Sequence, residues 1–183
     1  ACIGHDAVNL PNEHYYDLLN PAEFTTGSDV NKCQIAIGKA GTKYLQTKSK
    51  LLRSCWANVL AGKTGFTAPP GCPDTDAKTV TKLAQAEQKK VAAICKACGA
   101  GGDDDENGAC DLPGSAFTPA QIGFEPTCPD LTVPSTGTPC VSNVTSLAAL
   151  ITCVDCVTDF AIDCAADLAV PAAMPYPAEC NAP

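Results

Sequence analysis

Basic side chains are missing from most of this sequence. Residues 1–29 carry five acidic groups and no base, and residues 97–183 carry twelve acidic groups and no base. All twelve lysines and arginines lie in residues 30–96, against three acids, within a formal net charge of −8. Nucleic-acid binding is therefore not expected, because two acidic flanks would compete with phosphates for the basic segment. This segregation instead favours docking of segments with opposite charge, within one chain or between chains.

Long apolar runs and catalytic motifs are also missing. The longest apolar candidate is residues 147–170. Aspartates interrupt it, so it does not contain the ~20 consecutive apolar residues that a membrane-spanning helix needs. The start of the chain lacks a signal-peptide pattern, so we expect a mature exported form. With only two histidines and no nucleophile–base arrangement, the sequence does not indicate an enzyme.

What the sequence has in abundance is cysteine, with thirteen in 183 residues. Thiols at this density persist in oxidising compartments, where disulfides compensate for a thin hydrophobic core. Large apolar side chains are scarce, because much of the 45% apolar fraction is alanine, and this agrees with a thin core. We therefore expect a secreted, extracellular or periplasmic protein.

The sequence predicts an all-α fold organised around a disulfide-stapled helical hairpin at residues 28–98. The first helix is expected to begin at Ser28-Asp29 and end near Gly62, and the second to be capped at residues 74–76 and end at Gly99. The expected apolar stripe of the first helix is Cys33, Ile37, Ala40, Tyr44, Leu51, Cys55 and Val59. That of the second is Val80, Leu83, Ala84, Val91, Ile94, Cys95 and Cys98.

Three further segments complete the predicted organisation. Residues 1–27 form an N-terminal arm, and residues 99–139 form an acidic, proline-rich irregular segment with a single helical turn from Thr118 to Ile122. Its end, residues 131–139, is expected to be an extended linker. Residues 140–183 contain a third helix, from about 145 to 169, and a disulfide-tied tail.

Antiparallel hairpin geometry would bring Cys33 near Cys95 or Cys98, and Cys55 near Cys72. The remaining pairings are left open, because many are formally allowed. The expected framework uses Cys33, Cys55, Cys72, Cys95, Cys98, Cys110, Cys128, Cys140, Cys153, Cys156, Cys164 and Cys180. Thirteen is odd, so one cysteine is free or bridges to another chain, and Cys2 is the candidate for an intermolecular bond.

Two CxxC motifs occur, Cys95 to Cys98 and Cys153 to Cys156. We expect both to belong to the disulfide framework. A redox or metal carrier that uses their thiolates is the alternative.

The third helix carries four aspartates at i, i+4 spacing: Asp155, Asp159, Asp163 and Asp167. Like charges at this spacing destabilise an isolated helix, so a basic partner is expected. The row Lys32, Lys39, Lys43 and Lys50 is the predicted partner, from the same or a neighbouring molecule. A solvated acidic face is the alternative.

A calcium loop is the most specific ligand motif in the sequence. Its candidate ligands are Asp103, Asp105, Asn107, Ala109 and Asp111, with Gly108 at the sixth position. This matches the first part of an EF-hand-type loop, but Gly114 stands at position twelve in place of the bidentate Glu. The alternative is a solvated acidic turn. Separately, Asn143-Val144-Thr145 is an N-glycosylation sequon.

Two stretches, KCQIAIGKAGTKYLQTKSKLLRSCW…CPDTDAKTVTKLAQAEQKKVAAIC and CVDCVTDFAIDCAADLAVPAAMPYPAEC, resemble uncharacterised secreted cysteine-rich bacterial proteins with helical hairpins. The resemblance implies an exported all-α protein and transfers no functional residue. We predict a non-enzymatic extracellular structural protein that self-associates or decorates a cell-surface assembly. The alternatives are a small binding module for calcium or an apolar ligand, and the CxxC-based carrier.

Overall fold

The computed structural model has the all-α class that the sequence predicts. It describes residues 28–63, 72, 76–99, 110 and 116–169. The described elements are α2 (Asp29–Leu60), α3 (Ala77–Ala97), α4 (Pro119–Ile122), β1 (Thr132–Val133), β2 (Thr138–Pro139) and α5 (Leu147–Ala169).

Helices α2 and α3 form the predicted antiparallel hairpin, and both begin at the predicted caps. The Ser28 side chain accepts a hydrogen bond from the backbone N–H of Asn31. The Asp76 side chain accepts a hydrogen bond from the backbone N–H of Lys78. Asp76 is therefore the cap of α3 among the three candidates, residues 74–76. At the other end of α3, Gly99 has a φ of 84°, a left-handed conformation that glycine adopts at low cost.

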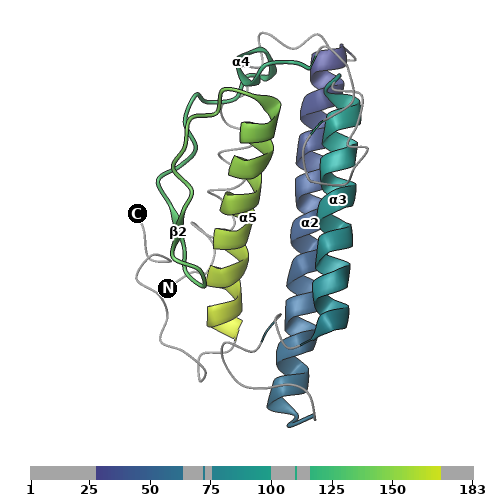
Figure 1. The fold of residues 1–183 in the computed structure, drawn as a ribbon, viewed down its shortest axis with the longest axis vertical. Coiled ribbons are helices and arrows are strands. Elements are labelled where there is room, and N and C mark those ends of the chain that lie inside the picture. The colour runs from purple at the N-terminus through teal and green to yellow at the C-terminus, as the bar shows by residue number, and fades with distance from the viewer. Residues whose placement is uncertain (1–27, 64–71, 73–75, 100–109, 111–115, 170–183) are drawn as a thin grey trace.

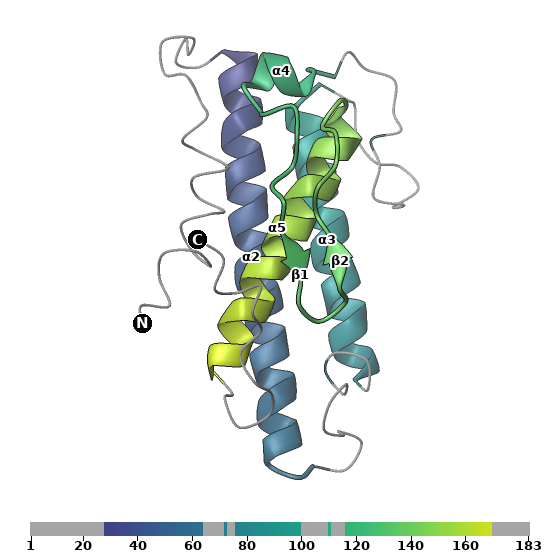
Figure 2. The same cartoon turned by 90° about the vertical axis from the view of Figure 1, so that its left-hand side faces the viewer.

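Helix α5 crosses the hairpin diagonally (Figure 2), from over α3 near its own N-terminus to over α2 near its C-terminus. Three members of the predicted stripes differ from the structure for this reason. Leu52, rather than Leu51, is buried on α2, which packs against both other long helices. Val80, which is 43% exposed, and Ala84 are both exposed on α3, because α5 lies over α2 rather than over this half of α3 (Figure 2).

Residues 124–146, here called the strap, cover the face of α5 that points away from the hairpin (Figure 1). The predicted extended linker within it is a short antiparallel hairpin in which Val133 pairs with Thr138. Leu131 and Val133 are buried in the core, and β1 packs against α5. Burial of these side chains explains why this stretch folds back instead of running free.

The core therefore has α5 at its centre, between the α2–α3 hairpin and the strap. The buried side chains of α5 come from all around the helix, with Phe160 only 1% exposed. The predicted turn is α4, which Thr118 and Gln121 close with a capping box. The Gln34 amide of α2 donates a hydrogen bond of 2.7 Å to the Ile122 carbonyl and ties α4 to the hairpin.

Candidate functional site

Five disulfides join described cysteines, and two of them follow from hairpin geometry. Cys33–Cys98 and Cys55–Cys72 confirm the predicted pairings and resolve the choice between Cys95 and Cys98. The other three are Cys95–Cys110, Cys128–Cys153 and Cys140–Cys156. Cys164 is also disulfide-bonded. Cys2 and Cys180 lie outside the described residues.

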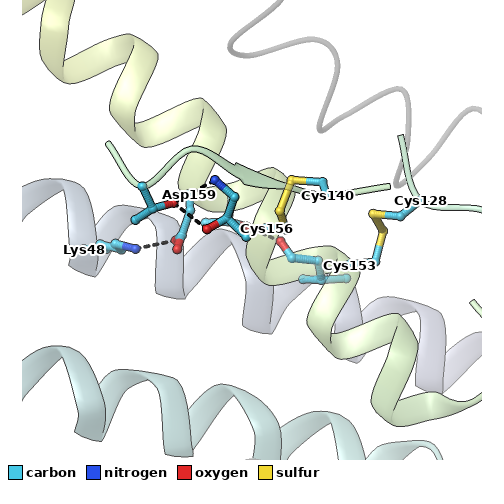
Figure 3. The surroundings of a disulfide bond; sticks show 10 residues. Lys48, Cys128, Cys140, Cys153, Cys156 and Asp159 are labelled. Atoms are coloured by element: carbon cyan, nitrogen blue, oxygen red, sulfur yellow. Dashed lines mark hydrogen bonds and ion pairs between the residues drawn. A yellow bond between two sulfur atoms is a disulfide. The ribbon is translucent and has the colours of Figure 1, made fainter. Parts of the chain in front are cut away.

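Both CxxC motifs belong to the disulfide framework, as predicted. Cys95 and Cys98 form two separate bonds, to Cys110 and to Cys33. Cys153 and Cys156 likewise bond to two cysteines of the strap (Figure 3). No thiol is left in either motif, so neither supports the carrier alternative.

These five disulfides fall into two separate groups. One group ties α2 and α3 to each other and to their connecting segments. The other ties α5 to the strap. Within the described ranges, none of these five bonds joins the hairpin to α5.

The centre of the interface between the hairpin and α5 is a buried lysine, Lys90 of α3, which is 2% exposed. Its Nζ donates a hydrogen bond of 2.6 Å to Glu87 Oε1 on the preceding turn. The same nitrogen contacts Asp155 Oδ1 on α5, and it lies 4.4 Å from the centroid of the Tyr44 ring on α2. One cation therefore meets all three long helices.

A second ion pair lies one turn further along α5, where Lys48 of α2 contacts Asp159 (Figure 3). The Lys48 Nζ lies 5.8 Å from the same Tyr44 ring. The Lys48 and Asp159 side chains are more exposed than that of Lys90, at 16% and 36% against 1%. This pair is therefore better solvated, and we expect it to contribute less to stability than its charges suggest.

Burial controls the protonation of this charged site, here called the interhelix cluster (Tyr44, Lys48, Glu87, Lys90, Asp155, Asp159). Loss of hydration lowers the pKa of Lys90, against the opposing effect of Glu87 and Asp159. Burial, followed by the charges of Asp159 and Glu87, raises the pKa of Tyr44 above its usual range. Tyr44 is therefore a neutral phenol at every physiological pH. The deprotonated, neutral form of Lys90 costs less free energy to reach than that of a solvated lysine.

Asp163 lies beyond the cluster on α5 and faces the strap. Its Oδ2 accepts a hydrogen bond of 3.0 Å from the backbone N–H of Ser135. Burial nevertheless raises the pKa of this carboxyl. The side chain of Asp167 is outside the described residues.

The predicted lysine partner of the acidic repeat is half correct. Asp155 and Asp159 do pair with lysines of the same chain. The partners, however, are Lys48 and Lys90, not the row that the sequence indicated. The members of that row, Lys32, Lys39, Lys43 and Lys50, are exposed.

One feature of the sequence indicates the interhelix cluster, namely the position of Lys90 in α3. Lys90 interrupts the apolar stripe of α3 immediately before the buried Val91. A charged residue at a core position is expected to have a buried partner.

The remaining predicted sites are not tested by the structure. The candidate calcium ligands Asp103, Asp105, Asn107, Ala109 and Asp111 lie outside the described residues, so calcium binding stays a prediction. Among the described residues there is no group of three or more His, Cys, Asp or Glu suited to a metal ion. Asn143 has an exposed side chain and its backbone bridges to Thr127, so the sequon is accessible.

None of the helices in the described ranges has the length and apolar character needed to cross a membrane. No family model, curated protein or solved structure matches this chain. The disulfide-rich helical frame fits a protein of an oxidising compartment, outside the cell or in the periplasm.

Proposed function

We propose that this is a non-enzymatic, secreted structural protein that self-associates in an extracellular assembly. The observation that carries the proposal is the outer surface of the hairpin. Exposed basic side chains follow both helices: Lys39, Lys43, Lys50 and Arg53 on α2, and Lys78, Lys82, Lys89 and Lys96 on α3. We call these eight residues the basic rows.

Helical spacing supports an outward orientation of the basic rows. Each row recurs at intervals of three, four or seven residues, so its members share one face of their helix. On α2 the row precedes the buried Ala40 and Tyr44 by one position each, about 100° around the helix. Among the described residues, the ion pairs are made by Lys32, Lys48 and Lys90, and none involves a member of the rows.

A second copy of the chain is the partner with the right chemistry. The segments outside residues 30–96 carry seventeen acidic groups and no base. Of these acids, Asp29, Asp155 and Asp159 are already paired within the described part of the chain. Acidic surface from one molecule can therefore meet the basic rows of the next, and such attraction increases both association rate and specificity.

The frame itself suits a structural role. Disulfides hold the hairpin and hold α5 to the strap, and each adds on the order of 2–4 kcal/mol to stability. A protein stapled in this way tolerates extracellular conditions without a large core.

Sedimentation velocity at low and high salt tests the proposal. The comparison is between the native sequence and a triple variant, Lys39→Glu, Lys43→Glu and Lys50→Glu. Exposed ion pairs contribute about 0.2–1 kcal/mol each, so the dissociation constant should rise about threefold to about 150-fold in the variant. High salt should weaken the native association in the same direction.

The matched control replaces the same three lysines by arginine, which keeps the charge and the exposed position. This control should associate like the native protein. A native protein that remains monomeric at every salt concentration, at concentrations up to the millimolar range, would contradict self-association.

A further inference from the structure

A covalent tie between α3 and α5 would unite the two disulfide groups. Disulfides with described partners hold the hairpin together and hold α5 to the strap, and none of them spans the interface between these two helices. The cross-interface contact at Lys90 is the most deeply buried charge contact between the two groups, since only 1% of that side chain is exposed.

The two carboxylates at Lys90 contact it in different ways. Glu87 accepts a hydrogen bond from Nζ. Asp155 Oδ1 contacts the same nitrogen but is buried and accepts no hydrogen bond among the described residues. The amine thus holds one carboxyl group as a hydrogen-bond partner while a second one lies directly against the nitrogen.

We propose that Lys90 and Asp155 join in an intramolecular isopeptide bond, with Glu87 as the group that transfers the protons. The Tyr44 ring forms part of the wall around the reacting atoms. The bond would link α3 to α5 and make the hairpin, α5 and the strap one covalent frame. It concerns maturation of the chain and does not depend on self-association.

The reaction balances without any oxidant or other reactant. The neutral amine of Lys90 attacks Cγ of the protonated Asp155 carboxyl, and a C–N bond forms. Glu87 takes a proton from the nitrogen and returns one to the departing hydroxyl, so the C–O bond breaks and one water leaves. The products are a secondary amide and Glu87 in its starting protonation state.

Burial favours each step. Removing water from an ammonium and a carboxylate is costly, and proton transfer between the buried Lys90 amine and the buried Asp155 Oδ1 lets both groups become neutral. The lowered pKa of Lys90 has the same cause and acts in the same direction. Exclusion of water also protects the product, because hydrolysis needs the water that left.

The Lys48–Asp159 pair is the internal comparison. It joins α2 to α5 with the same two residue types, yet its amine is more exposed, since 16% of the Lys48 side chain is exposed against 1% for Lys90, while the aspartates are alike at 36% and 29%. No second carboxylate forms an ion pair with Lys48 among the described residues. The conditions for amide formation are therefore absent there, and we infer that this pair remains an ion pair.

Mass spectrometry of the reduced, denatured protein is the direct test. The native protein should be lighter than its fully reduced sequence by one water, about 18 Da. Trypsin gives a second readout, because no lysine or arginine follows Lys96. The fragment 97–183 should carry the peptide KVAAICK, residues 90–96, because trypsin does not cleave after an acylated lysine.

Three variants identify the groups. Asp155→Asn should form the same amide by loss of ammonia, about 17 Da instead of about 18 Da. Glu87→Gln should keep the full mass and release VAAICK after trypsin. Asp159→Asn, which removes the neighbouring carboxylate from the same helix, should keep the link.

The results that overturn the proposal are equally direct. A native protein of full mass with cleavage after Lys90 would show that the pair is only ionic. A link that persists in Glu87→Gln would remove Glu87 from the chemistry. The first conclusion is drawn from the native chain itself, and the second from a link that forms only in a folded variant, so neither outcome can be produced by misfolding.

Discussion

Removal of the Cys33–Cys98 disulfide should destabilise this protein more than removal of Cys55–Cys72. The first bond closes 65 residues and the second closes 17. In the loop-entropy description these correspond to about 4 and about 3 kcal/mol. The second loop is nested within the first and shortens it by those 17 residues, which changes the first value by only a few tenths of a kcal/mol.

Burial increases the difference between the two bonds. Cys33 and Cys98 are both fully buried in the core, whereas Cys72 is half-buried beside the buried Cys55. A buried sulfur is similar in size to a methylene, so each one lost adds about 1 kcal/mol. We therefore expect Cys33→Ala/Cys98→Ala to cost about 6 kcal/mol and Cys55→Ala/Cys72→Ala about 4 kcal/mol.

Urea unfolding followed by far-UV circular dichroism, without reductant, measures both values. The two double variants remove the same atoms, so each is the control for the other. An equal cost, or a larger cost for the Cys55–Cys72 variant, would refute the reasoning from loop length and burial. A cost near 6 kcal/mol is a large part of the 5–15 kcal/mol that typical domains have, so the first variant should be close to unfolding.

Two other substitutions test α5. Asp163→Asn should raise the melting temperature at pH 7, because burial holds the pKa of Asp163 above its unfolded value and the charged form therefore favours the unfolded state. The gain should shrink as the pH falls through the raised pKa, where the native carboxyl is protonated too; a constant gain across pH would contradict this origin. Phe160→Ala should cost about 3–5 kcal/mol in urea unfolding, since Phe160 is 1% exposed. Leu60→Ala, at a side chain that is 71% exposed, should change stability by less than about 0.5 kcal/mol, and similar costs for both would place Phe160 outside the core.

Helix positions and ends were predictable because their signals are local. Ser28 caps α2 through its own side chain, and Thr118 with Pro119 starts α4. The i, i+3 and i, i+4 spacing of apolar residues likewise marks a helix wherever it packs. The Cys33–Cys98 and Cys55–Cys72 bonds followed, since an antiparallel hairpin leaves few cysteines opposite each other.

The course of the strap was not predictable in this way. Residues 131–139 have the composition of a linker, yet Leu131 and Val133 are buried in the core around α5. Whether a short apolar pair is buried depends on what passes over it, which local sequence does not contain.

Charge pairing was likewise predictable only in part. Segregation of acids and bases along the chain predicted that α5 would meet lysines, and it does so at Asp155 and Asp159. The diagonal crossing of α5 over the hairpin decided that these lysines are Lys48 and Lys90. The crossing depends on how the helix surfaces fit together, and only that fit buries Lys90 between two carboxylates and leaves the basic rows facing outward.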